Sequence, residues 1–346
     1  MYRLIFTLII TIAFVSNHAV SRTPSSLLIY YGFPSLINNS SGNLNLAIQS
    51  FSMYDYVVIG DCLQEDGSAT DTICPHSPHP DHVNTVNIIN HPSLSSKRFF
   101  GYIDLGVRSI FDGSPRQNLS IAEIQRRAQL WAAMGVDGIL LDDFGYDFEV
   151  SRDRQRAAVS IIHNFGLAVI ANGFRVDDVF SDTIDPVFNP KGLSPNLGEQ
   201  DYYLYESHQI ILGDFDSESN WQIKANALEN FRQSLNFKIL SITTVGIGDT
   251  FSEDQFFYAW HSAAMYEHHA TGWGELFFSA GDNNAPFRIR PMIQINEFVS
   301  DINQQGSVYE RIACNGLLSI NAESGINSFD FTAGEFCLLF SNGFEN

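Results

Sequence analysis

The strongest constraint on the fold is a regular alternation of apolar, strand-like runs with helical segments. Residues that are apolar on both faces of a strand are typical of parallel strands covered by helices. Eight such runs predict a closed (β/α)8 barrel of the TIM type, an α/β fold. A doubly wound open sheet is the alternative, but no G-x-G-x-x-G follows the first run and no G-x-x-x-x-G-K-[ST] occurs. The runs are Leu27–Gly32, Tyr54–Gly60, Phe99–Gly106, Gly138–Asp143, Leu167–Gly173, Tyr202–Ser207, Lys238–Val245 and Glu275–Ala280.

Helix-capping serines precede four of the periodic segments between these runs: Ser120, Ser151, Ser219 and Ser252. Glu123 and Gln222 stand three residues after the first and third serines, which completes two capping boxes. We expect the last of these helices to reach His269. The segment Asp182–Gln200 has no such pattern, and a loop of that length in a compact domain is usually functional or hides a short helix.

The N-terminal segment has the composition of a secretory signal peptide. Arg3 precedes the apolar run Leu4–Val15, which is followed by the small residues Ala19 and Ser21. We expect cleavage after Ser21, with an uncleaved anchor as the alternative. The predicted organisation is therefore a signal peptide over 1–21, a barrel over 22–306 and a β-rich extension over 307–346.

The charge and the cysteines agree with a secreted protein. Of the 346 residues 39 are acidic and 19 are Lys or Arg, so a net charge of −20 disfavours nucleic acid and anionic membranes as partners. Four cysteines allow three pairings, and we favour Cys62–Cys74 and Cys314–Cys337 because each closes a local loop. We expect a monomer that needs no cofactor and no metal.

Acidic and hydrogen-bonding residues gather where the predicted strands end, and in a barrel of this type that end carries the active site. Carboxylates that converge on one cleft repel each other, which favours a functional explanation. Asp142 and Glu206 come from strands two apart in the barrel and fit a pair that cleaves a glycosidic bond. For Asp61 and Asp143, binding of loop amides is an equally good explanation. The predicted substrate-binding residues are Tyr30, Tyr31, Asp61, Asp104, Asp143 and Asn172.

Two of these strand ends resemble a known family. The run from Gly135 to Phe144 is similar to the fourth-strand signature of the endo-α-1,4-polygalactosaminidases and of related barrels, namely spherulin-4-like proteins and a hydrolase domain that acts on the Pel exopolysaccharide. The run from Gly101 to Gly106 resembles their third-strand motif, and Glu206 falls where they carry a glutamate. The resemblance implies a glycoside hydrolase acting on α-1,4-linked galactosamine or N-acetylgalactosamine, with Asp142 and Glu206 as its catalytic pair. Some relatives have Asn or Glu at the position of Asp143, so the resemblance implies the class of reaction but does not fix the identity of the substrate.

Several readings remain open from the sequence alone. A retaining mechanism needs the two carboxyl groups about 5–5.5 Å apart and an inverting one about 6.5–9.5 Å, while an N-acetylated sugar also allows a substrate-assisted route. A second possible class of function is a catalytically silent barrel that binds carbohydrate. A metal-dependent hydrolase is a third, with ligands from the loop that contains His76, His79, Asp81 and His82, although Asp81 also suits the N-cap of a helix. Trp273 is predicted to be a packing residue that precedes the eighth strand.

Overall fold

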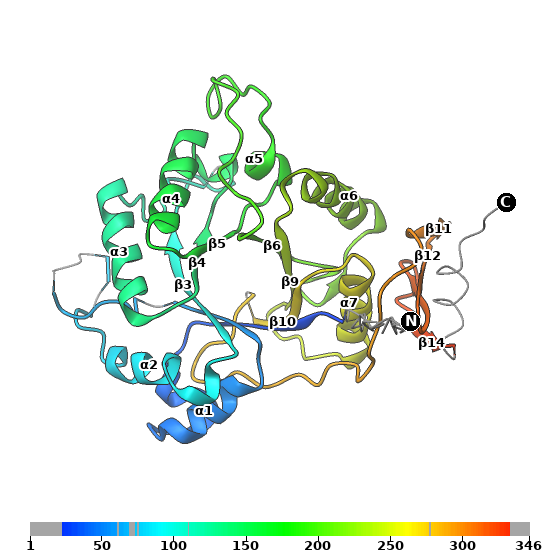
Figure 1. Cartoon of the computed structure of the whole chain (residues 1–346), viewed down its shortest axis with the longest axis horizontal. Coiled ribbons are helices and arrows are strands. Elements are labelled where there is room, and N and C mark those ends of the chain that lie inside the picture. The colour runs from blue at the N-terminus through cyan, green and yellow to red at the C-terminus, as the bar shows by residue number, and fades with distance from the viewer. Residues whose placement is uncertain are drawn as a thin grey trace, which may run out of the picture.

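The computed structural model describes residues 23–60, 62–68, 73–74, 76–109, 111–276 and 278–332. The predicted signal peptide, Asp61 and Cys337 lie outside these residues. Eight parallel strands close into a barrel in the order β1-β10-β9-β6-β5-β4-β3-β2, which confirms the predicted fold class (Figure 1). The barrel strands are β1 (Ser25–Tyr30), β2 (Tyr56–Ile59), β3 (Arg98–Asp104), β4 (Gly138–Asp142), β5 (Ala168–Ala171), β6 (Tyr202–Glu206), β9 (Lys238–Val245) and β10 (Ala270–Leu276).

The last strand of the barrel corrects the sequence prediction. It begins at Ala270 and pairs there with Ser25 of β1 and Leu240 of β9, whereas the run Glu275–Ala280 lies at its end and beyond it. Two glycines hide this strand in the sequence. A Cβ on Gly272 would lie 2.2 Å from a carbonyl oxygen of β1, so only glycine lets the two backbones approach this closely. Trp273 is therefore inside the strand rather than before it, and it packs against Phe251 and Phe256 as predicted.

Helices surround the barrel and begin mostly where the capping serines predict. Ser120, Ser151 and Ser252 accept the predicted N-terminal hydrogen bonds, but α6 starts after Ser217 instead of Ser219. The last helix ends at Met265, because the chain turns there to enter β10. The α-helices are α1 (Leu44–Ser52), α2 (His82–Ile89), α3 (Ile121–Met134), α4 (Arg152–Asn164), α5 (Val176–Phe180), α6 (Glu218–Leu235) and α7 (Glu253–Met265), and the short 3-10 helices are η1 (Pro34–Asn39), η2 (Pro92–Leu94) and η3 (Tyr146–Phe148).

The core divides along the alternation of the strands. One set of side chains fills the barrel interior, among them Leu140 of β4, Ile170 of β5 and Leu204 of β6. The alternate set packs outward against the helices. At Gly101 of β3 a Cβ would lie 2.3 Å from the ring of Trp131, so the glycine makes room for α3. Between α5 and β6 the segment 182–200 has no helix, and the Asn189 side chain bonds the backbone within it.

A small antiparallel sheet follows the barrel, as expected for the C-terminal extension. Its strands are β11 (Asn303–Gln305), β12 (Val308–Ala313), β13 (Gly316–Asn321) and β14 (Asn327–Phe331), so it begins slightly before the predicted boundary. Side chains of the sheet and of α6 and α7 form one apolar cluster. Tyr309 also donates a hydrogen bond to Glu218 at the start of α6 (2.7 Å).

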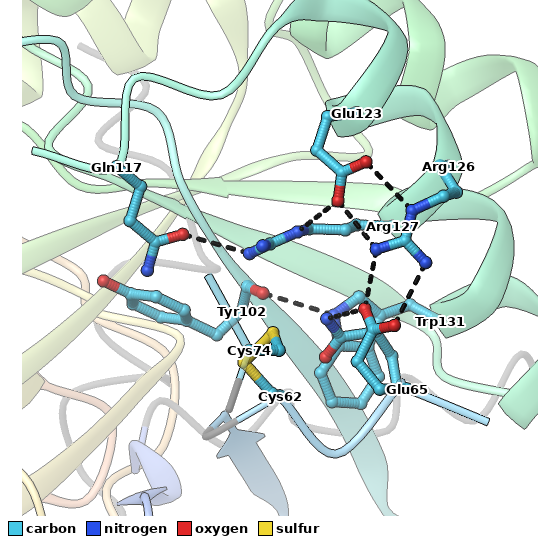
Figure 2. The surroundings of a disulfide bond; sticks show 10 residues. Cys62, Glu65, Cys74, Tyr102, Gln117, Glu123, Arg126, Arg127 and Trp131 are labelled. Atoms are coloured by element: carbon cyan, nitrogen blue, oxygen red, sulfur yellow. Dashed lines mark hydrogen bonds and ion pairs between the residues drawn. A yellow bond between two sulfur atoms is a disulfide. The ribbon is translucent and has the colours of Figure 1, made fainter. Parts of the chain in front are cut away.

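The predicted Cys62–Cys74 disulfide is present in the loop after β2 (Figure 2). The same loop carries Glu65, whose buried carboxylate accepts two hydrogen bonds from Arg126 of α3 (2.8 and 3.1 Å). Arg126 also pairs with Glu123, so the loop is bound to the helix that covers β3 and β4. No helix within the described ranges is long and apolar enough to cross a membrane.

Candidate active site

The alternation of the strands brings three polar side chains to the mouth of the barrel. Asp142 and Glu206 are the last residues of β4 and β6, and Asn172 follows β5 directly. Each stands two residues after an interior side chain, and residues two apart on a strand point to the same face. The three therefore form a polar layer at the C-terminal end of the barrel, above its apolar filling.

One amide group joins the two acids. The Nδ2 of Asn172 donates to Oδ1 of Asp142 (3.0 Å) and to Oε2 of Glu206 (2.5 Å). The two oxygens can lie no further apart than these two distances combined, about 5.5 Å. Asp142 and Glu206 thus face each other across a single hydrogen-bond donor.

The surroundings of Asp142 contain several donors. The hydroxyl of Tyr102 donates to its Oδ2 (2.9 Å), beside the bond from Asn172. Burial raises the pKa of Asp142 above its ordinary value, and the hydrogen bonds from the Tyr102 hydroxyl and the N–H of Asp143 oppose this rise without cancelling it. Hydrogen bonds of this kind favour the ionised form of a carboxyl group.

Glu206 lies in an environment that favours its neutral form. Burial, followed by the negative charge of Asp142, raises the pKa of Glu206 to about 7. The bond from Asn172 and the charge of Lys224 act in the opposite direction. Lys224, on α6, donates to the backbone oxygen of Glu206 (3.0 Å) and lies over the ring of Tyr205 (4.8 Å). Its own pKa is lowered to about 8, mainly by burial.

Asp143 is held beside the pair by an ion pair. Its Oδ2 lies 3.0 Å from Nε of Arg116, and its backbone adopts the left-handed conformation (φ 53°). Burial and the neighbouring Asp142 raise the pKa of Asp143 to about 8. Asp142 and Asp143 interact strongly, so the protons of the cluster are shared among its acids.

A cavity of about 630 Å³ opens over these groups. Its polar lining includes Asp142, Asp143, Asn172, Glu206 and Lys224. Its other wall is apolar and comes from several elements: Phe148, Phe174, Ile211, Ile223 and Phe278. Ile211 belongs to the hairpin of β7 (Ile210–Ile211) and β8 (Asp214–Phe215), which follows β6. A mostly apolar cavity with a few convergent polar groups is the usual form of a small-molecule site.

One predicted binding residue is placed in the core by the structure. Tyr30 is fully buried, donates to the backbone oxygen of Phe33 (3.0 Å) and packs on Phe51, so it is a core residue. The alternation from Leu27 and Ile29 explains this correction, because it turns Tyr31 inward and Tyr30 outward.

Asp104 is buried at the end of β3 and holds the loop that follows it. Its oxygens accept from the backbone N–H groups of Gly106 (2.7 Å) and Gln117 (3.2 Å), which fix the loop after β3. Substrate binding by Asp104 stays a prediction. Tyr31, in contrast, packs edge-on against Tyr102 (5.4 Å), and its pKa is raised by burial and then by Asp142 and Glu206. Tyr31 therefore borders the acid pair, while Asp61 lies outside the described residues.

The sequence analysis missed three parts of the site. Tyr102 could have been found, because it stands two residues before Asp104 on a strand whose alternate side chains point inward. Lys224 lies on a helix with no signal that links it to the strand ends. The aromatic wall comes from loops, and in a chain with 28 phenylalanines no single one stands out.

The histidine loop does not form a metal centre in the described part of the chain, where no three His, Cys, Asp or Glu side chains are grouped to hold an ion. Asp81 is the N-cap residue of α2, as predicted, but its oxygens accept from the Ser35 N–H (2.8 Å) and from Asn84 (2.8 Å). His82 places Nδ1 2.9 Å from the backbone oxygen of Leu63. These contacts describe a packed loop.

Neither a protein-family profile nor a curated protein matches this sequence. Among solved structures, α-galactosidase I from Mortierella vinacea is 12% identical over 88% of this chain and 83% of that chain, with a TM-score of 0.49. The α-galactosidase from Saccharomyces cerevisiae with raffinose is 12% identical over 87% and 74%, with a TM-score of 0.45. The HpcH/HpaI aldolase from Desulfitobacterium hafniense is 11% identical over 75% and 87%, with a TM-score of 0.38. Likenesses this distant say nothing about activity.

Proposed function

We propose that this protein is a secreted, endo-acting glycoside hydrolase that cleaves an amino-sugar polysaccharide by a retaining mechanism. The observation that carries the proposal is the Asn172 amide shared by Asp142 and Glu206, which keeps their facing oxygens within about 5.5 Å. A separation of about 5–5.5 Å is typical of retaining enzymes, because an inverting pair needs room for a water molecule. Two carboxyl groups with different surroundings at the edge of one cavity are the minimum that this reaction requires.

The two roles follow from the surroundings of each acid. Asp142 is assigned as the nucleophile because its carboxylate accepts hydrogen bonds from Tyr102 and Asn172, and the Tyr102 bond opposes the rise in its pKa that burial causes. Glu206, with a pKa raised to about 7, holds a proton near neutral pH and is the acid. In the first step an Asp142 oxygen bonds to the anomeric carbon. The glycosidic C–O bond breaks, and its electron pair stays on the leaving oxygen, which takes the Glu206 proton.

The second step returns the enzyme to its starting state. Glu206, now charged, takes a proton from a water molecule as the water oxygen bonds to the anomeric carbon. The bond from that carbon to Asp142 breaks and leaves the carboxylate free. The product keeps its original anomeric configuration because each step inverts it once.

The substrate class rests on the family resemblance of the third and fourth strands and on charge. The net charge of −20 suits a polymer with free amino groups, since opposite charge favours their encounter. We therefore propose α-1,4-linked galactosamine, in part N-acetylated, as the substrate. Export is proposed from the N-terminal pattern and agrees with the Cys62–Cys74 disulfide, because disulfides persist in oxidising compartments.

The test is sugar release by the purified protein from α-1,4-galactosamine polymers graded by acetylation. Asp142→Asn and Glu206→Gln should each lower the rate by at least about 100-fold, while the exposed Glu323→Gln keeps it. NMR of the first product should find a retained anomeric configuration. Release that survives both substitutions would remove the acid pair from the mechanism. Binding without release would favour the silent carbohydrate-binding barrel.

A further inference from the structure

Two phenylalanine rings are exposed to solvent, one in the lining of the cavity and one packed against it. Phe174 is 61% exposed and Phe111 is 63% exposed, which is unusual for large apolar side chains. Burial of such a side chain stabilises a folded protein, and these two positions lose most of that stabilisation. Contiguous exposed apolar groups on a soluble protein commonly mark a binding site.

The exposed rings form one continuous surface with a third ring. Phe111 packs edge-on against Phe174 (5.6 Å between centroids) and against Phe148 (6.2 Å). The guanidinium of Arg116 lies over the ring of Phe148 (5.1 Å). We call Phe111, Phe148 and Phe174 the aromatic shelf.

The shelf begins at the candidate active site. Phe174 stands two residues after Asn172, so their Cα atoms lie at most about 7 Å apart, and the Asn172 amide is the one that joins Asp142 and Glu206. Phe148 and Phe174 line the cavity with these acids, whereas Phe111 is not among the lining residues. The shelf therefore leads from the acid pair to the outside of the cavity.

We propose that the aromatic shelf binds the apolar faces of sugar rings next to the bond that is cleaved, with Phe174 as the inner and Phe111 as the outer position. This inference rests on the proposed function, because it takes the acid pair as the point of cleavage. A sugar ring offers hydroxyl or amino groups at its edge and C–H groups on its face. Such a ligand satisfies both the acidic wall and the aromatic wall, which a purely apolar partner does not.

The position of the shelf also predicts a dependence on chain length. A short oligosaccharide that fills only the cavity reaches Phe174. A longer one extends over Phe111, which lies further from the acids. Loss of Phe174 should therefore weaken binding of all substrates, and loss of Phe111 only that of the longer ones.

The test measures binding separately from cleavage. Isothermal titration of the Glu206→Gln protein with α-1,4-galactosamine oligosaccharides of increasing length gives the dissociation constants. Phe174→Ala in this background should weaken binding about tenfold, the size of one aromatic contact, and Phe174→Trp should restore it. Phe111→Ala should weaken binding only above a threshold length. Phe331→Ala is the matched control, because Phe331 is 65% exposed and lies on the C-terminal sheet.

The outcomes separate the shelf from the proposed reaction. Unchanged affinity in Phe174→Ala, with release by the wild type intact, overturns the shelf and leaves the hydrolase standing. Weakened affinity without any release by the wild type supports the shelf and overturns the reaction. If neither galactosamine oligosaccharides nor a panel of neutral and N-acetylated glycans bind, the shelf is not a sugar site. Equal losses in Phe174→Ala and Phe331→Ala also overturn it.

Discussion

Ionisation of Glu206 should make the folded protein less stable as the pH rises, and removal of its carboxyl group should abolish this contribution. Its pKa is about 7 in the folded protein, against an ordinary value of 4.5. A carboxyl group whose pKa is raised by folding stabilises the protein when protonated, and this contribution disappears as the pH rises through the folded pKa. Each unit of pKa difference corresponds to about 1.4 kcal/mol, so the loss between pH 4 and pH 8 is about 3 kcal/mol.

The assay compares urea unfolding of the wild type and of Glu206→Gln, followed by circular dichroism from pH 4 to pH 8. Gln cannot ionise, so the difference in unfolding free energy between the two proteins should change by about 3 kcal/mol in favour of the variant as the pH rises. Titrating groups that do not interact with Glu206 cancel in this difference, whereas its neighbours Asp142 and Lys224 contribute to it. Glu323→Gln, which removes an exposed carboxyl group, should follow the wild type. A Glu206→Gln difference that is the same at pH 4 and pH 8 would refute the assigned environment of Glu206.

Three further predictions concern the residues around the site. Lys224→Met should move the alkaline limb of the kcat/KM profile to higher pH, because the positive charge of Lys224 lowers the pKa of Glu206. Lys224→Arg keeps the charge and should move this limb far less. A shift to lower pH in Lys224→Met would contradict this pairing. Replacing both cysteines of the Cys62–Cys74 loop by serine should lower thermal stability by about 3 kcal/mol, measured by calorimetry, and an unchanged melting temperature would contradict it. Gly101→Ala should cost about 1–3 kcal/mol in urea unfolding, because its Cβ would overlap the α3 tryptophan ring at 2.3 Å; a neutral result would mean that the helix moves freely.

The barrel could be predicted because parallel strands buried on both faces leave a simple pattern in the sequence. The acids at the ends of β4 and β6 could be predicted for the same reason, since barrel topology brings strand ends together whatever lies between them. The misplaced eighth strand had a physical cause as well. Gly272 has no side chain to contribute to a hydrophobic pattern, yet the close approach of β1 requires glycine there.

The distinction between Tyr30 and Tyr31 could have been drawn from the sequence. Leu27 and Ile29 are both interior residues, so the period of two assigns Tyr31 to the barrel mouth and Tyr30 to the helix-facing side. Asp104 illustrates the opposite case. Its position in the strand places it on the same face as the site residues. Two backbone N–H groups of the following loop donate to its carboxylate, and no sequence pattern predicts where a loop will fold back.

The parts of the site that escaped prediction share one property, which is that they come from elements outside the strands. Lys224 reaches Glu206 from α6, and Phe174 and Phe111 come from two different loops. In the proposed reaction the strand ends supply the reacting groups, because the barrel fixes their positions. Loops and helices would supply the groups that adjust the pKa of the acid and contact the remainder of the ligand. Changes of Lys224 should therefore alter the pH profile, changes of the aromatic shelf should alter affinity for long chains, and only changes of the strand-end acids should abolish the reaction.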